Sequence, residues 1–164
     1  AVSTVPDDLS LYNNFRYQLD ATLADGQPES GYGMVFYRRN SNNYYVFAVN
    51  GLQQWSIWRL EDGQWQELRN LPNDQTWTNS DAVLPPGETN QLTLEAYSGE
   101  FNLFVNGISL GQVSDPTAPE AGGLIGMYVA SSRTADDAFA DARFDNVQLD
   151  PLDEFTVPSM AVEQ

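Results

Sequence analysis

The chain has 164 residues, of which 41% are hydrophobic, and its 23 acidic and seven basic residues give a net charge of −16. This length fits one domain with a packed core. No apolar run approaches the ~18 residues of a membrane helix. The negative charge disfavours binding to nucleic acids and to anionic membranes. The seven basic residues are all arginine, and Cys, His and Lys are absent, which excludes disulfides, thiolate metal sites, imidazole bases and Schiff-base chemistry.

Short segments of alternating apolar and polar residues run through the chain, and each predicts a β-strand that buries one side. Residues 33–65 are the densest region, rich in Tyr, Phe, Trp and Val, with tight-turn signals at Asn50-Gly51 and Asp62-Gly63. Residues 69–90 are expected to form a loop. The predicted strands, in chain order, are 15–23, 32–39, 44–49, 55–60, 64–68, 91–98, 101–105, 108–113, 124–130 and 139–149.

Roughly nine or ten strands without any helical periodicity predict an all-β fold, a two-sheet antiparallel β-sandwich or jelly roll. We expect residues 1–14 to form an N-terminal arm, residues 15–150 the sandwich, and residues 151–164 a C-terminal extension or linker. The chain begins at Ala1 without a signal peptide, so we expect a processed protein or an excised piece.

Four segments, taken in order, resemble the concanavalin A-like jelly rolls of lectins and glucanases, and in particular their laminin G-like and 3-keto-disaccharide-hydrolase-like members. The segments are 31–49 (GYGMVFYRRNSNNYYVFAV), 92–111 (LTLEAYSGEFNLFVNGISLG), 122–131 (GGLIGMYVAS) and 142–149 (ARFDNVQL). The resemblance implies a buried side that contains Leu92, Leu94, Ala96, Leu103, Val105, Ile125, Met127 and Phe144. It also implies a concave, partly solvated face, on which ligands of such domains lie, that presents Thr93, Glu95, Tyr97, Phe104 and Tyr128.

Tryptophans supply the first candidate binding residues. Trp55 and Trp58 are three apart in one strand, so we expect one in the core and the other, Trp58, on the surface. An exposed indole suits stacking against the apolar face of a sugar ring; the alternative is that both tryptophans pack internally. Trp65 and Trp77 lie in turn or loop regions, and Trp77 is flanked by hydrogen-bonding side chains. Trp77 is therefore either part of a sugar-binding loop or a buried anchor for that loop.

The concave face implied by the resemblance supplies the remaining candidates. Tyr97, Phe104 and Tyr128, with Glu95 between them, would form an aromatic ligand platform. The alternative is that a loop, the N-terminal arm or a neighbouring domain covers these rings.

Paired carboxylates could act as the catalytic groups of a glycosidase. The Glu-x-Asp-x-x-Glu strand of the related glucanases is absent from this sequence. Asp141 and Asp145 share a face if the closing strand is regular, but Arg143 lies between them, so an ion pair is the simpler interpretation. We therefore predict no catalytic residue and no enzyme.

Calcium is the one cofactor that the acidic loops suggest. Asp136, Asp137 and Asp141 cluster in sequence and offer the oxygen ligands that calcium prefers, without the spacing of an EF-hand. The alternative is that these acids are simply solvated, in keeping with a charge that serves solubility; a saline habitat and cation binding remain open.

The fold resemblance, the strand aromatics and the missing catalytic motif favour a non-catalytic carbohydrate-binding or adhesion module of a larger protein, extracellular or periplasmic. Its partners would be a glycan, a surface protein or other domains of the same polypeptide. The alternative is a structural or assembly subunit that docks on a protein through its terminal arms. A third hypothesis, a glycoside-active enzyme, rests on analogy with relatives that act on keto-sugars, and fold alone does not fix function.

Overall fold

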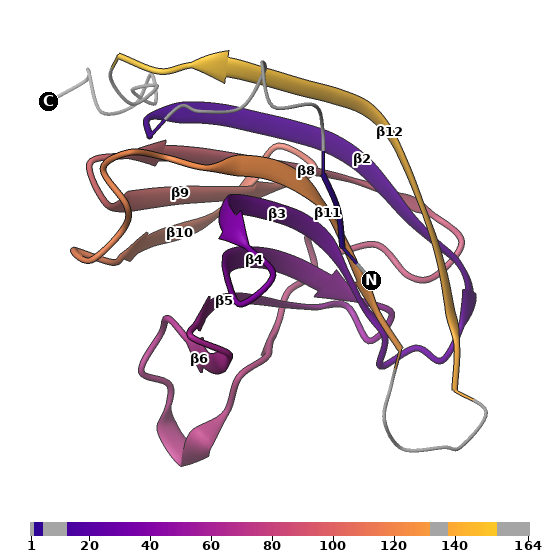
Figure 1. The fold of residues 1–164 in the computed structure, drawn as a ribbon. Coiled ribbons are helices and arrows are strands. Elements are labelled where there is room, and N and C mark those ends of the chain that lie inside the picture. The colour runs from indigo at the N-terminus through magenta and orange to yellow at the C-terminus, as the bar shows by residue number, and fades with distance from the viewer. Residues whose placement is uncertain (1, 5–12, 132–137, 154–164) are drawn as a thin grey trace, which may run out of the picture.

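The computed structural model describes residues 2–4, 13–131 and 138–153, and these residues form two stacked antiparallel β-sheets (Figure 1). Within the described residues the larger, seven-stranded sheet is called the major sheet and the five-stranded one the minor sheet. The strands of the major sheet are β1 (Val2–Thr4), β3 (Gly31–Asn40), β4 (Asn43–Asn50), β5 (Gln54–Glu61), β6 (Gln64–Glu67), β7 (Thr78–Asn79) and β11 (Leu124–Ala130). Those of the minor sheet are β2 (Phe15–Gly26), β8 (Thr89–Tyr97), β9 (Glu100–Val105), β10 (Ile108–Ser114) and β12 (Ala140–Pro151).

The strand order confirms the predicted two-sheet antiparallel sandwich. The major sheet runs β1-β11-β3-β4-β5-β6, with β7 paired to β5, and the minor sheet runs β10-β9-β8-β2-β12. Across the described ranges there is one 3₁₀ turn, η2 (Pro72–Asp74), and no α-helix. The helix search, confined to those same ranges, finds none of the length and apolarity that a membrane crossing requires.

Two predicted boundaries differ from the structure. Residues 2–4, expected in an N-terminal arm, form β1 and pair with β11, which places Val2 opposite Tyr128. Within the expected loop 69–90, β7 and η2 form, and β8 already begins at Thr89. Strands of two or three residues are too short to show alternation, so their pairing partners decide whether they form.

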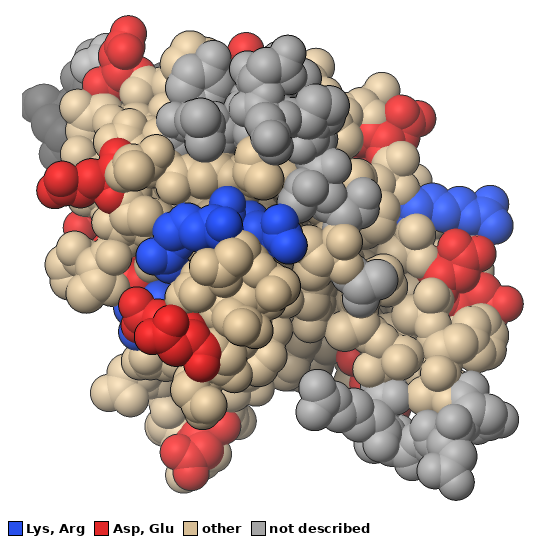
Figure 2. Space-filling view, in the orientation of Figure 1, with Lys and Arg blue, Asp and Glu red and all other residues tan. Residues whose placement is uncertain are grey.

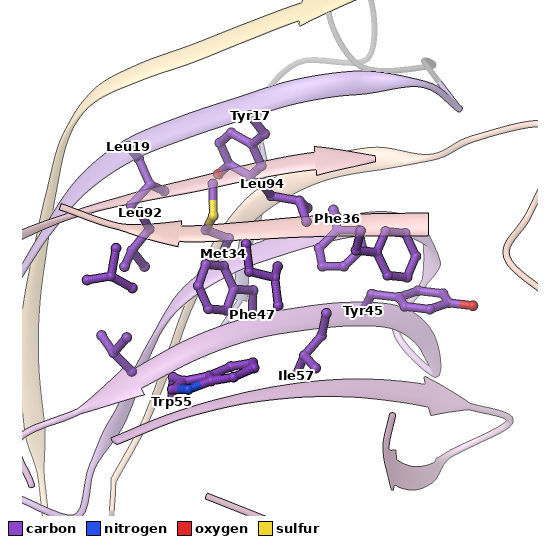
Figure 3. Packing of buried hydrophobic residues seen from close by; sticks show 14 of the residues in the cluster. Tyr17, Leu19, Met34, Phe36, Tyr45, Phe47, Trp55, Ile57, Leu92 and Leu94 are labelled. Atoms are coloured by element: carbon purple, nitrogen blue, oxygen red, sulfur yellow. The ribbon is translucent and has the colours of Figure 1, made fainter. Parts of the chain in front are cut away.

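The core lies between the two sheets, and alternation along the strands places it there. Along β2, side chains alternate between buried and half-buried for nine residues, and one buried side faces the major sheet (Figure 3). Phe36 is central, with ring centroids 5.3–6.3 Å from those of Phe15, Tyr37, Tyr45 and Phe101. The buried side implied by the resemblance is confirmed, with Met127 and Phe144 packed at its edge.

The middle of the major sheet is buried on its outer face as well. Seven successive residues are buried at the start of β3 and again at the end of β4, so these strands lack a solvated side. The outer face carries a second apolar cluster, which consists of Val35, Tyr44, Val46, Ala48 and Leu60, with Val2, Trp58, Trp77 and Tyr128 packed on it. Apolar area on the outside of a sandwich is where a binding site is expected.

Charges are dispersed on the face shown in Figure 2. A short band of arginine side chains crosses the middle of this view, carboxylates occur in small groups around it, and most of the visible surface is uncharged. The visible face therefore carries no single acidic patch, although the whole chain has a net charge of −16.

A buried carboxylate ties the two sheets together at one end. Asp115, which follows β10, is 4% exposed and accepts hydrogen bonds from Tyr45 (2.7 Å) and Arg59 (3.0 Å) of the major sheet. The backbone N–H and the hydroxyl of Thr117 also donate to it. Burial alone would raise the pKa of Asp115, but the hydrogen bonds from Thr117 and Tyr45 and the charge of Arg59 outweigh it and lower the pKa below its usual range.

Asp115→Asn is expected to lower the free energy of unfolding at pH 7 by about 1–3 kcal/mol, because Arg59 and Tyr45 lose an ionised acceptor. Since the folded-state pKa is lowered, this stabilisation is present above the unfolded pKa of about 3.9 and is lost as pH falls through the folded value. Urea unfolding of both proteins from pH 7 to pH 2 should therefore show the difference shrinking in acid. A difference that stays constant with pH would contradict the assignment.

Candidate functional site

A hollow of about 460 Å³ opens on the outer face of the major sheet, a size typical of small-molecule sites. Its walls are aromatic: Trp58 from β5, Trp65 from β6, Tyr128 from β11, and Trp77 from the segment before β7. Small residues and polar residues complete its lining. These further lining residues are Gly31, Ala48, Ala130, Glu29, Thr76 and Ser131.

Strand register explains why the hollow forms here. Across the sheet, Tyr128 on β11 lies opposite Gly33 on β3, which lies opposite Ala48 on β4. The two positions next to Tyr128 in this cross-strand row are therefore occupied by small residues. On Gly31, an added Cβ would lie 3.3 Å from the Trp77 indole and 3.8 Å from the Tyr128 ring. Glycine at position 31 thus allows both rings to lie close over the sheet.

The aromatic walls stand at steep angles to one another. Trp65 is central: its ring lies 6.1 Å from Trp58 at 86°, 6.4 Å from Tyr128 at 66°, and 5.6 Å from Tyr44 at 85°. Edge-to-face contacts of this kind stabilise the rings and leave faces free. Trp65 is 42% exposed, so part of its ring is available to a ligand.

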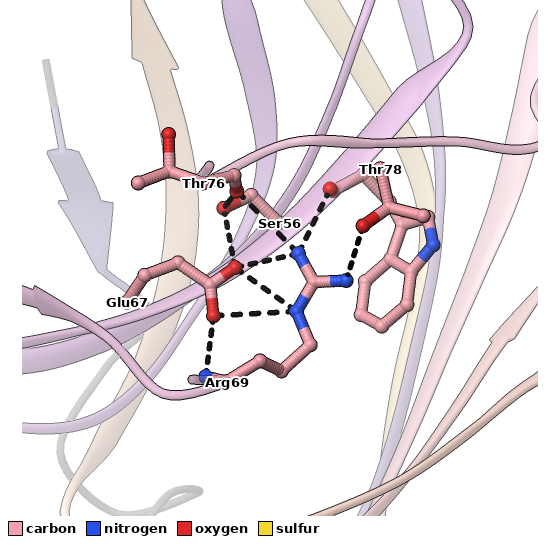
Figure 4. Close-up of polar contacts among 6 residues, drawn as sticks. Ser56, Glu67, Arg69, Thr76 and Thr78 are labelled. Atoms are coloured by element: carbon pink, nitrogen blue, oxygen red, sulfur yellow. Dashed lines mark hydrogen bonds and ion pairs between the residues drawn. The ribbon is translucent and has the colours of Figure 1, made fainter. Parts of the chain in front are cut away.

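An arginine–glutamate cluster holds the segment that carries Trp77 (Figure 4). Arg69 Nε donates to Glu67 Oε2 at 3.0 Å, and its terminal nitrogens reach Glu67, the Thr78 hydroxyl (2.7 Å) and the Thr76 carbonyl (3.4 Å). The Ser56 hydroxyl donates to the same Thr76 carbonyl and to Glu67. Both neighbours of Trp77 are therefore anchored to β5 and to the end of β6.

This cluster is largely withdrawn from water, which strengthens its electrostatics. The side chain of Glu67 is 4% exposed and that of Arg69 is 13% exposed. The Arg69 guanidinium also lies 3.8 Å above the Trp55 ring, on the core side of β5. Neither residue was a candidate from the sequence, because 67–69 and 76–78 meet only through the folded loop. The one sequence signal was a Glu and an Arg two residues apart, followed seven residues later by a Thr-Trp-Thr segment.

The structure brings some predicted site residues together and separates others. Trp58, Trp77 and Tyr128 line one hollow, and Trp65, expected only in a turn, joins them. Trp55 is 6% exposed in the core, so the prediction that Trp55 and Trp58 face opposite ways is confirmed.

The prediction that Tyr128 shares a face with Tyr97 and Phe104 is wrong. Tyr128 belongs to β11 in the major sheet, whereas Tyr97 and Phe104 belong to β8 and β9 in the minor sheet. Alternation tells which residues of a strand share a side, but it does not tell which sheet the strand joins.

Glu95 lies with Phe104 on the outer side of the minor sheet, against a smaller hollow of about 210 Å³. The glutamate is 1% exposed, lies opposite Arg16 in the register, and is 3.9 Å from the Arg16 Nε. Phe104 is the one aromatic residue that lines this hollow, beside Arg16, Gln91, Thr93 and Gly107. The three-aromatic platform is therefore not assembled on this face.

The calcium hypothesis stays a prediction, because two of its three residues are not described. Asp136 and Asp137 lie outside the described residues, and Asp141 forms an ion pair with Arg143 at 3.2 Å. Among the residues that the structure describes, no three acidic side chains are grouped so as to hold a metal ion.

No family model matches the chain, and no curated protein matches it. Among solved structures, it is similar to the carbohydrate binding module CBM66 from Bacillus subtilis, with 16% identity, 91% of this chain and 76% of that one covered, and a TM-score of 0.65. Sheep galectin-11, solved in complex with glycerol, matches with 16% identity, coverage of 91% and 96%, and a TM-score of 0.60.

A third similar structure is a much longer chain. The GH43 protein BlXynB from Bacillus licheniformis matches with 12% identity and a TM-score of 0.60, over 86% of this chain and 28% of that one. At such low identities the likeness shows the fold alone, which is a jelly-roll β-sandwich. The fold implied by the resemblance noted from the sequence is thereby confirmed.

Proposed function

We propose that this chain is a non-catalytic carbohydrate-binding module whose ligand stacks in the aromatic hollow of the major sheet. The observation that carries the proposal is the lining itself, which combines Trp58, Trp65, Trp77 and Tyr128 with small and polar residues. A sugar ring has apolar C–H faces and a rim of hydroxyls, which this combination complements. The likeness in fold to a carbohydrate binding module and to galectins supports the same ligand class.

Binding without catalysis is supported by the carboxylates around the hollow. Among the described residues that line it, Glu29 is the one carboxylate. Glycoside hydrolysis ordinarily needs a pair of carboxyl groups, about 5–9.5 Å apart, on either side of the scissile bond. The match to the GH43 chain covers 28% of that chain, so it is no argument for hydrolysis. An extracellular or periplasmic module of a larger protein is the setting in which such binding would serve.

The test is a glycan array followed by titration calorimetry with the best-bound saccharide, for the parent protein, Trp58→Ala and Phe104→Ala. We expect Trp58→Ala to abolish measurable binding and Phe104→Ala to leave it within about twofold, because Phe104 belongs to the other sheet. The absence of any saccharide ligand would refute the function. Loss of binding in Phe104→Ala alone would place the site on the minor sheet.

A further inference from the structure

Most arginines of this acidic chain have a carboxylate partner. In residues 2–4, 13–131 and 138–153, ion pairs are formed by Arg16, Arg59, Arg69 and Arg143. Arg38 and Arg39, at the end of β3, form none with those same residues. The Nε of Arg38 is moreover buried without a hydrogen-bond partner. A half-buried arginine without a carboxylate partner among the described residues is unexpected in a chain with 23 carboxylates.

Arg38 belongs to the same surface as the aromatic hollow. In the β3–β4 hairpin Phe36 lies opposite Tyr45 and Asn40 opposite Asn43, which places Arg38 and Tyr44 side by side on neighbouring strands. In keeping with this placement, burial raises the pKa of the Tyr44 hydroxyl and the charge of Arg38 lowers it. Tyr44 is part of the apolar cluster on the outer face of the major sheet, and its ring is 5.6 Å from that of Trp65. Tyr44 therefore connects Arg38 to Trp65, which lines the hollow, although Arg38 itself is not among the lining residues. Arg39, next in sequence, is exposed.

The two ends of this surface differ in charge. Glu29 lines the hollow and disfavours an anion there, whereas Arg38 lies next to Tyr44 and its buried Nε has no hydrogen-bond partner. A guanidinium matches a carboxylate in two parallel, charge-assisted hydrogen bonds. The net charge of −16 opposes anionic ligands at long range, but the Debye length is only about 8 Å at physiological salt, so a contact pair outweighs distant carboxylates.

We propose that Arg38 forms a second subsite, which takes the carboxylate of an acidic sugar. This inference rests on the proposed function and narrows its ligand to uronate-containing oligosaccharides. Such a ligand binds in one direction, with a neutral ring stacked in the hollow near Glu29 and the acidic ring beyond Trp65 at Arg38.

The test uses pairs of oligosaccharides that differ only in a carboxylate or its methyl ester, titrated against the parent protein and three variants. The parent should bind the acidic member about tenfold more tightly, as expected for a charge-assisted bond. Arg38→Gln should bind acid and ester equally, and Arg38→Lys should keep part of the preference because it retains the charge without the planar fork. Arg39→Gln is the matched control: it removes the same charge from the adjacent residue and should keep most of the preference.

Equal binding of acid and ester by the parent overturns the subsite, and so does a preference that survives in Arg38→Gln or disappears to the same extent in Arg39→Gln. In these cases the neutral esters still bind, so the proposed function stands. If no member of any pair binds, ester or acid, the proposed function fails and the subsite fails with it. Near-ultraviolet circular dichroism of each variant confirms that the comparison is between folded proteins.

Discussion

Trp77→Ala is expected to weaken saccharide binding by at least about 2 kcal/mol, roughly thirtyfold, because buried tryptophans dominate the energetics of binding sites. Trp77 lies over Gly31 and forms one wall of the hollow. Removing its indole takes away a stacking surface and leaves that side of the ligand in water. Trp77→Phe should recover part of the loss, since a smaller ring keeps an aromatic face. Titration calorimetry with the ligand found by array measures both variants.

The control for this prediction is another large apolar residue outside the hollow. Phe139 is 51% exposed and is not among the residues that line it. Phe139→Ala should therefore bind like the parent. Equal losses in Trp77→Ala and Phe139→Ala would show that the effect arises from general surface hydrophobicity, which would contradict a role for Trp77 in the site.

Arg69→Met is expected to lower the free energy of unfolding by about 3–5 kcal/mol, because it leaves the buried carboxylate of Glu67 without its ion-pair partner. Saccharide binding should weaken as well, since Arg69 holds the Thr76 carbonyl and the Thr78 hydroxyl on either side of Trp77. Urea denaturation and titration calorimetry, done at a temperature where the variant is folded, separate the two effects.

The molecule offers a matched control in Arg143, whose ion pair with Asp141 is exposed, with side-chain exposures of 75% and 45%. Arg143→Met should change the stability by less than about 1 kcal/mol, as is usual for surface pairs. The double variant Glu67→Gln/Arg69→Met should regain stability without regaining affinity, because the buried charge is gone but the Trp77 segment is still loose. Full affinity in either Arg69 variant would contradict the positioning role.

The two-sheet fold could be predicted from the sequence because the alternation of apolar and polar residues is a local property of each strand. Residues 15–23 and 91–98 show which side chains face the core, and the structure buries Leu92, Leu94 and Ala96 completely. The tight turn after β5 was likewise predictable from Asp62-Gly63, both of which adopt positive φ. The chain also turns after β4 at Asn50-Gly51, but there the residue with positive φ is Gln53. A two-layer sandwich follows from many such strands.

The candidate site could be predicted only in part, because it depends on which strands become neighbours. Trp58 was recognised from its offset from Trp55, but Trp65 and Tyr128 meet it only through the order β11-β3-β4-β5-β6. The arginine–glutamate cluster joins residues 67–69 to residues 76–78, and neither stretch has a periodic pattern of apolar residues. Neither set of contacts produces a periodic pattern in the sequence, so neither could be predicted from the sequence.

The face assignment failed for the same reason. β8 and β11 both alternate, and the sequence alone gave no sign that one belongs to the minor and the other to the major sheet. The consequence is functional: the aromatic surface with a size and lining suited to a ligand is on the major sheet, while the minor sheet presents Glu95 covered and paired with Arg16.

The most direct test is to follow the indole N–H signals of the four tryptophans by ¹H–¹⁵N NMR during titration with a bound saccharide. Trp58, Trp65 and Trp77 line the hollow, whereas Trp55 is 6% exposed in the core and serves as an internal reference. A ligand in the hollow should shift the first three signals and leave that of Trp55 nearly unchanged. Saturable binding that shifts none of those three would show that the sugar binds elsewhere on this protein.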